Sequence, residues 1–89
     1  MTAAEVAICS RHTVLALDGE IDLVSAPDVR ALLADIVNDH STRAVVIDLA
    51  GVTFMDSSGV GALLSAYRPL KLQRRPLVVA QPQAIVARV

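Results

Sequence analysis

One short segment holds the residue types and spacing that point to chemistry: Phe54-Met55-Asp56-Ser57-Ser58-Gly59-Val60-Gly61. Asp and Ser are good helix N-caps, and the segment has three consecutive residues of these types, Asp56, Ser57 and Ser58. A helix N-terminus presents unpaired N–H groups and a partial positive charge, so it favours a phosphate. Two glycines in one helical turn cost about 0.5–1 kcal/mol each relative to alanine, so they need an explanation.

Three interpretations of this segment stay open from the residues alone. In the first, Ser57 caps a helix, and Gly59 and Gly61 allow tight packing on a sheet. In the second, the turn binds a nucleotide phosphate; this signal is weak, because position 64 is leucine instead of a third glycine and no GxxxxGK motif occurs. In the third, a serine is itself phosphorylated, which adds about −1.5 to −2 charge and opposes a partner interface.

Nucleophilic catalysis has little support in this sequence. A serine nucleophile needs an adjacent base such as histidine. His12 and His40 fall at predicted turns, far along the chain from Ser57. We therefore expect a protein that is not an enzyme.

Metal and redox chemistry are equally weak. Asp22, Asp48 and Asp56 lack the spacing of a coordination motif, so caps are the better interpretation. Cys9 is the only cysteine, which excludes an intramolecular disulfide and a CxxC motif. We expect no metal and no cofactor.

The elements that must position the segment begin with two strands and a helix. Short apolar runs at 5–9 and 13–21 predict a hairpin. Ser25 with Asp28 resembles a capping box, and Pro27 suits the first turn of a helix. An apolar face of period 3.6 then predicts a helix that ends near Asn38.

The second half alternates strand and helix. The runs 44–49 and 77–80 are typical of strands buried on both faces. Between them, a helix follows Asp56 and stops near Pro69, and its predicted core face is Val60, Leu63, Leu64 and Tyr67. A third helical pattern starts at Gln81-Pro82 and reaches the last residue. This order predicts an α/β fold with a mixed sheet of about four strands.

Composition sets further bounds. The 89 residues are 54% apolar and 19% charged, which indicates one folded domain and excludes disorder. The net charge of −1 argues against a dedicated nucleic-acid binder. Charge-free runs stay below the 18 or so residues of a membrane helix, and no signal peptide is apparent, so a cytoplasmic protein is expected.

The charges are unevenly distributed along the chain. All nine acidic residues precede position 57, and five of the eight basic residues follow it. Four of these form a basic cluster, defined as Arg68, Lys71, Arg74 and Arg75. Charge runs are usually solvated, so we expect a solvated loop here, with phosphate or acidic-partner binding as the minority interpretation.

Two motifs carry a family resemblance. Met55-Asp56-Ser57-Ser58-Gly59-Val60-Gly61 closely resembles the phosphorylation-site motif of bacterial anti-sigma factor antagonists, which are STAS-domain proteins. Gly19-Glu20-Ile21-Asp22-Leu23-Val24-Ser25-Ala26-Pro27 resembles the family's other signature, at the family's spacing. The resemblance covers essentially the whole chain, as a single STAS domain over 1–89.

The resemblance implies a partner-switching function. The unmodified protein binds an anti-sigma factor and frees the sigma factor. The anti-sigma factor is also a serine kinase that uses ATP and Mg²⁺; phosphorylation ends the interaction, and a PP2C-type phosphatase restores it. The acceptor maps onto Ser57. The residues expected to contact the partner are Asp22, Met55, Asp56, Ser58, Gly59 and Val60.

Two other functions remain as alternatives. One is a STAS module in another assembly, such as a lipid-transport complex or a stress-signalling scaffold. The other is a small nucleotide-binding protein. The chain also departs from the family at its end: members usually continue past the third helix, whereas Val89 falls inside that pattern, so we expect a domain truncated in its third helix.

Overall fold

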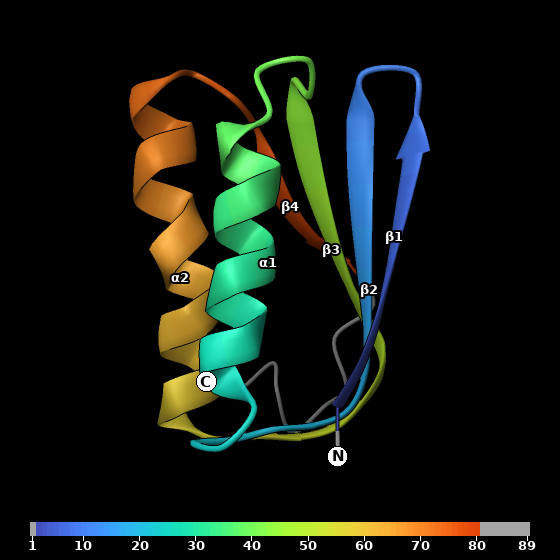
Figure 1. The fold of residues 1–89 in the computed structure, drawn as a ribbon, viewed down its shortest axis with the longest axis vertical. Helices are drawn as coiled ribbons and strands as arrows, with labels where there is room; N and C mark the ends of the chain where they lie inside the picture. Colours follow the sequence, from blue (N-terminus) through green and yellow to red (C-terminus); the bar gives the residue numbers. More distant parts are fainter. Residues whose placement is uncertain (1, 81–89) are drawn as a thin grey trace.

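The computed structural model describes residues 2–80, which form a four-stranded sheet and two helices (Figure 1). The elements in chain order are β1 (Thr2–Cys9), β2 (His12–Ile21), α1 (Ala26–Asn38), β3 (Ala44–Met55), α2 (Ser57–Leu72) and β4 (Leu77–Ala80). The strands lie in sequence order, with β1 antiparallel to β2 and the others parallel. The predicted mixed α/β sheet is confirmed. The helix predicted from Gln81 lies outside the described residues.

A two-residue turn closes the hairpin between β1 and β2. Cys9 pairs with His12, so only Ser10 and Arg11 lie between the strands. Ser10 has φ 56°, in the left-handed region, as tight hairpin turns require. The hairpin is confirmed, but β1 begins at Thr2, earlier than the predicted start at residue 5, because its pairing with β2 continues to Gly19.

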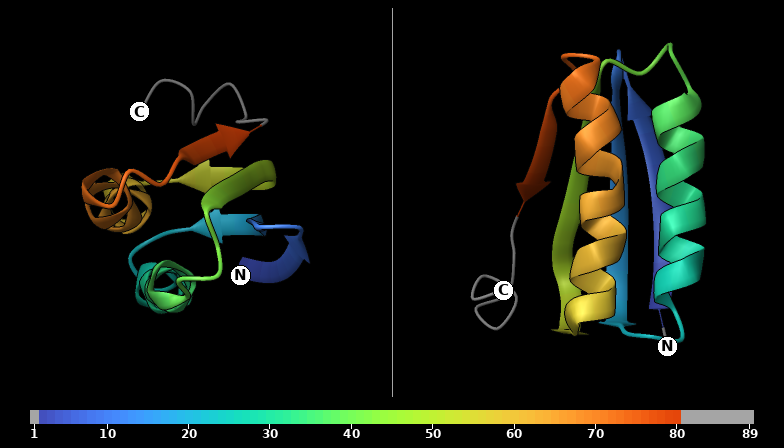
Figure 2. Two further views of the ribbon diagram at one scale, coloured as in Figure 1. Left: turned by 90° about the horizontal axis from the view of Figure 1, so that it is seen from above. Right: turned by 90° about the vertical axis from the view of Figure 1, so that its left-hand side faces the viewer.

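The core lies between the sheet and the helices, which cover the same face of the sheet (Figure 2). Alternate side chains of β2 and β3, such as Leu15, Leu17 and Ile47, point into this layer and are at most 1% exposed. The prediction that residues 77–80 are buried on both faces is wrong. Val78 and Val79 are nearly half exposed, because β4 ends the strand order and has one neighbouring strand within residues 2–80.

The face of α2 that packs into the core matches the predicted one in part, since Val60 and Leu63 are partly buried against the core. Leu64 and Tyr67 are 59% and 46% exposed, and Lys71 lies over the Tyr67 ring, 5.6 Å from its centroid. Small residues take the inner face together with one leucine: Gly59, Ala62, Ala66 and Leu70. They repeat at helical spacing too, and their small size lets α2 approach α1 and the sheet closely.

The end of α2 also differs from the prediction. The helix continues through Pro69 to Leu72. A proline removes one backbone N–H and kinks a helix, but it does not prevent the following residues from staying helical. Leu70 is fully buried just beyond it, and this packing explains why the last turn persists.

One member of the basic cluster is structural, which corrects the expectation of a solvated loop. Arg75 donates from Nη1 to the carbonyl oxygen of Val37 at 2.7 Å and from Nη2 to that of Asp39 at 3.2 Å. It thereby satisfies carbonyl groups at the C-terminus of α1, which a helix end leaves unpaired. Arg68, Lys71 and Arg74 are exposed, as predicted, but Arg68 and Lys71 belong to α2 and not to a loop.

Candidate functional site

Two turns meet at one end of the sheet, after the parallel strands β2 and β3. Ile21 and Met55, the last residues of these strands, are register partners. The N–H of Asp56 donates to the carbonyl oxygen of Ile21 at 3.2 Å. The structure therefore brings the two sequence motifs together at the carboxyl ends of parallel strands, where α/β proteins commonly place their sites.

Asp22 organises the first turn. Its Oδ1 accepts hydrogen bonds from the N–H of Val24 and of Ser25, at 3.0 and 3.1 Å. These donors stabilise the carboxylate, so they hold the pKa of Asp22 below its ordinary value of 3.8, with the Ser25 N–H as the largest cause. Asp22 is thus a structural residue of the loop, whatever else it contacts.

The capping box predicted at Ser25 is wrong. Ser25 stands at the N-cap position of α1, but its side chain caps no N–H of that helix. Its φ of −90° and ψ of −19° are helical, whereas a capping residue usually has extended geometry. The Oγ atom instead donates back to the carbonyl oxygen of Glu20 at 3.1 Å.

Asp56 is the N-cap of α2. Its Oδ1 accepts from the N–H of Gly59 at 3.1 Å, and its backbone is extended. Ser57 is the first helical residue, its side chain is exposed, and its hydroxyl makes no hydrogen bond with residues 2–80. The interpretation of Ser57 as a capping residue is therefore wrong. Asp56 caps the helix, so the Ser57 hydroxyl is not used as a cap.

Gly59 holds the turn against the sheet. A Cβ atom there would lie 2.6 Å from Cγ of Met55 and 2.7 Å from the carbonyl oxygen of Ile21. Met55 itself is 6% exposed and belongs to the core. Both residues were predicted as partner contacts. That role stays a prediction, but the structure places their side-chain positions inside, where they support the turn.

The remaining predicted contacts lie nearer the surface. Asp22, Asp56, Ser58 and Val60 are partly exposed. Ser58, Val60 and the adjacent Ser57 belong to the first turn of α2. The structure thus assembles a small surface in which the Ser57 hydroxyl follows the capping residue Asp56, at the end of the sheet that also carries the turn of Asp22.

Sequence reasoning missed three exposed apolar residues at this end. Leu23 and Val24 are 74% and 85% exposed in the turn that Asp22 organises, and Phe54 is 43% exposed on β3. Leu23 and Val24 follow an acidic residue in a predicted loop, where a large apolar side chain has no core to enter. That placement is the signal that could have found them.

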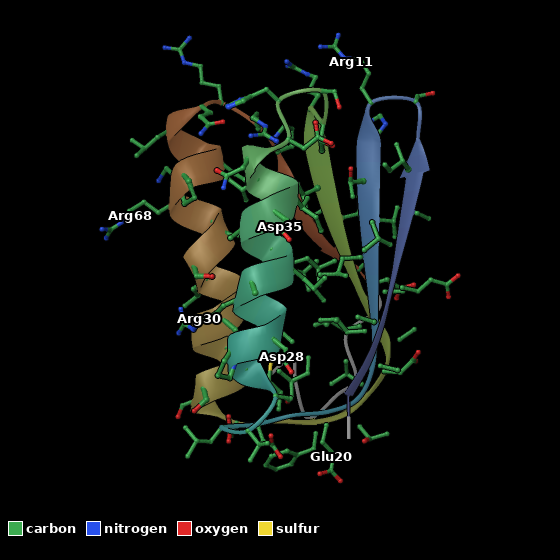
Figure 3. The ribbon with its side chains drawn as sticks, viewed as in Figure 1. Arg11, Glu20, Asp28, Arg30, Asp35 and Arg68 are labelled. Atoms are coloured by element: carbon green, nitrogen blue, oxygen red, sulfur yellow. The ribbon has the colours of Figure 1, made fainter. Side chains whose placement is uncertain are left out.

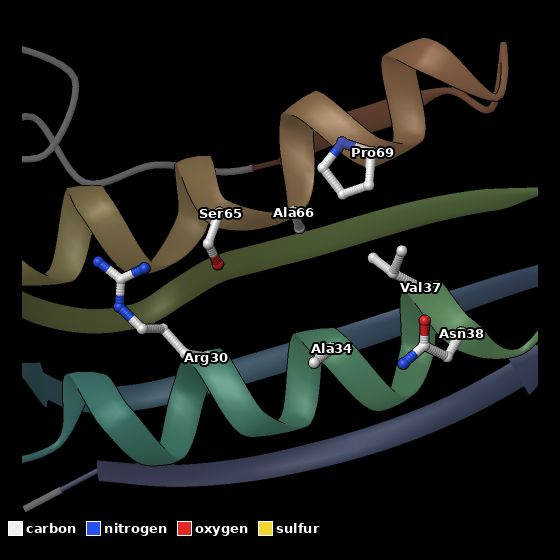
Figure 4. Close-up of a pocket in the computed structure, with 7 residues that line it drawn as sticks. All are labelled: Arg30, Ala34, Val37, Asn38, Ser65, Ala66 and Pro69. Atoms are coloured by element: carbon white, nitrogen blue, oxygen red, sulfur yellow. The ribbon is translucent and has the colours of Figure 1, made fainter.

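Arg30 is a further residue that the sequence did not single out. It lies on α1 and borders a groove of about 330 Å³ between the helices, at the end nearer the start of α2 (Figure 4). The groove continues past Ala34 and Ser65 to Asn38 and Pro69. Glu20 lies at the end of the sheet that carries the two turns (Figure 3).

Neither a metal cluster nor a membrane span is found in the part of the chain that the structure describes. No group of three or more His, Cys, Asp or Glu side chains in residues 2–80 is arranged to hold an ion. Within the same residues, no helix is long and apolar enough to cross a bilayer.

Comparison with known proteins assigns the fold and the motifs to a family. The family model of the STAS domain matches residues 3–89. The chain belongs to the STAS-domain family. The anti-sigma F factor antagonist of Lysinibacillus sphaericus is 30% identical over 81 residues, which are 90% of this chain and 69% of that protein. This similarity places the STAS domain described here among the anti-sigma factor antagonists.

Two further comparisons support the family and the fold, respectively. The anti-sigma-B factor antagonist of Listeria monocytogenes is 32% identical over 68 residues, covering 76% of this chain and 59% of that protein. The chain thus spans about three fifths of that relative. The anti-sigma factor antagonist SpoIIAA of Bacillus has the same fold in its unphosphorylated and phosphorylated forms. Its TM-score is 0.82 at 23% identity, over 97% of this chain and 79% and 78% of those chains.

Proposed function

We propose that this STAS domain is a partner switch controlled by phosphorylation of Ser57. In its unmodified form it binds an anti-sigma factor in the cytoplasm and thereby frees a sigma factor. The anti-sigma factor is also the serine kinase that modifies Ser57, and a PP2C-type phosphatase reverses the modification. The observation that carries the proposal is the exposed hydroxyl of Ser57, which makes no hydrogen bond within residues 2–80 and follows the capping Asp56.

The electrostatics of the site give the switch its direction. A phosphate adds about −1.5 to −2 charge next to Asp56 and near the turn of Asp22. Like charges brought together across an interface, and the desolvation of a phosphate, each oppose binding. The fold itself tolerates the group, because it stands on an exposed helix N-terminus. Phosphorylation of Ser57 is therefore expected to destabilise the complex with the anti-sigma factor and to leave the folded domain intact.

Phosphorylation and binding are tested with two substitutions at one position. Ser57→Ala is expected to abolish the phosphate-sized mass increase produced by a cognate anti-sigma kinase with ATP and to bind that kinase constitutively. Ser57→Glu is expected to bind about tenfold more weakly or worse, because it places a charge in the interface. Ser58→Ala is the matched control and should keep the mass increase. Equal affinities of the two Ser57 variants would contradict the switch.

The same assay separates the alternatives. A folded chain that no cognate kinase modifies would indicate a STAS module of another assembly. Consumption of ATP by the isolated chain would indicate a nucleotide-hydrolysing protein.

The apolar turn residues belong to the proposed partner surface. Leu23 and Val24 are held beside the site by the hydrogen bonds of Asp22. Exposed apolar side chains on a rigid turn are suited to anchor an interface. The double substitution Leu23→Ala, Val24→Ala should weaken binding about tenfold or more and leave the free energy of unfolding nearly unchanged.

Isothermal titration with the anti-sigma factor measures this effect. Leu72→Ala is the control, since Leu72 is 79% exposed at the opposite end of α2. A similar loss of affinity in both variants would contradict an anchor at the turn.

A further inference from the structure

Arg30 extends from α1 to the beginning of α2. Figures 3 and 4 show its side chain leaving α1 and ending beside the first turns of α2. Its Nη2 atom lies 3.0 Å from the position that a Cβ would occupy on Gly61. Because Gly61 has no side chain, the guanidinium can lie against this turn of the helix.

Gly61 and Ser57 share one face of α2. Residues four apart on a helix are neighbours, with about 5–6 Å between their Cβ positions. Helical side chains also lean towards the N-terminus of their helix. A phosphate on the Ser57 hydroxyl would therefore stand about one turn from the Arg30 guanidinium, within the reach of a long and flexible side chain.

The Arg30 guanidinium has no competing partner within residues 2–80. It makes no ion pair and no hydrogen bond with any described residue. Arg75 differs, since its guanidinium is engaged by Val37 and Asp39. An arginine fork matches the geometry of phosphate oxygens and binds them through two donors.

We propose that Arg30 binds the phosphate on Ser57 and holds it against the groove between α1 and α2. The inference rests on the proposed function, because it takes Ser57 as the acceptor. Arg30 contacts the modified residue, and its charge keeps the phosphate in its dianionic form near neutral pH. The modified site is then a fixed dianion rather than a group that moves freely in solvent.

The test measures the second pKa of the phosphate by ³¹P NMR. Phosphoserine is incorporated at position 57 during synthesis of the full chain, so the measurement needs no kinase. The ordinary second pKa of phosphoserine is about 6, and a neighbouring arginine lowers it. Arg30→Gln is expected to raise this pKa by about 0.5 unit or more, and Arg30→Lys by less.

Arg68→Gln is the matched control, because it removes the same charge from an exposed site on α2, about 16 Å along the helix from Ser57. Equal phosphate pKa values in the parent chain and Arg30→Gln, or equal changes in both Gln variants, would overturn the role of Arg30. The outcome is independent of the kinase assay: a chain that no kinase modifies contradicts the proposed function, whereas an unshifted titration contradicts only the arginine contact.

Discussion

Gly59 decides how closely α2 meets the sheet. The Cβ of any other residue would lie within 3 Å of Met55 and of both the backbone and the side chain of Ile21. One of these neighbours is a carbonyl oxygen that already accepts from Asp56. It cannot retreat without loosening the link between the two turns, so the helix would have to move.

Replacing each glycine of α2 by alanine should give opposite results. Gly59→Ala is expected to lower the free energy of unfolding by about 1–3 kcal/mol, as overpacking in a core does. Gly61→Ala should raise it by about 0.5 kcal/mol, because only the end of the Arg30 side chain is near and alanine favours a helix. Urea unfolding measures both values. Equal destabilisation by the two substitutions would contradict this assignment of the glycines.

The sequence located the turns but not their internal hydrogen bonds. Asp56, Ser57 and Ser58 are all competent caps, so residue type alone left the capping residue open. Extended backbone geometry at Asp56 decided it. At Ser25 the same reasoning failed, because its Oγ bonds backwards, to the N–H of Asp22 and the carbonyl oxygen of Glu20. The N–H of Asp28 donates to the backbone carbonyl oxygen of Ser25 instead.

At the level of elements, α2 shows the limit of hydrophobic periodicity. Its large residues and its small residues both repeat at helical spacing, on different faces. A rule that follows side-chain size selects Leu64 and Tyr67, but close packing against α1 and the sheet selects Gly59, Ala62 and Ala66. The strands were easier to find, but not their extent or burial. The run 44–49, predicted to be buried on both faces, continues to Met55 as β3, and buried and partly exposed residues alternate along it from Val45 to Leu49.

Two leucines of α2 test this orientation. Leu70→Ala should destabilise the domain by about 2–5 kcal/mol, because Leu70 is fully buried and its removal leaves a cavity. Leu64→Ala should change the free energy of unfolding by about 0.5 kcal/mol or less, since Leu64 is 59% exposed. Denaturant titration measures the free energy of unfolding of both variants. A larger decrease for Leu64→Ala than for Leu70→Ala would contradict this orientation of α2.

Across the whole molecule, α2 separates Ser57, the proposed switch residue, from the basic cluster. The helix has 16 residues and spans about 24 Å, with Ser57 at one end and most of the cluster in its last turns and beyond. The uneven charge along the sequence is not a separation of acidic from basic residues in space, because Arg75 of the cluster contacts Asp39 at the end of α1. The cluster is remote from Ser57, the proposed acceptor, and its member Arg75 stabilises the end of α1.

Arg75→Ala should lower the free energy of unfolding by about 1–3 kcal/mol. It removes charged hydrogen bonds to the carbonyl groups of Val37 and Asp39, which lie 38 and 36 residues away in sequence. Thermal unfolding of the variant provides the measurement. Arg74→Ala is the control: Arg74 is exposed with φ 55°, a strain that arginine and alanine share. An Arg75 variant as stable as this control would contradict the structural role.

The hydrogen bond from Asp56 to Ile21 has a consequence for protein engineering. It joins the two turns through backbone atoms alone, so what it demands is a fixed alignment of two strand ends rather than particular side chains. A designer who grafts the seven residues around Ser57 onto another scaffold will transfer the hydroxyl without its support. A transplant that works must carry the ends of both parallel strands, in register, as one piece.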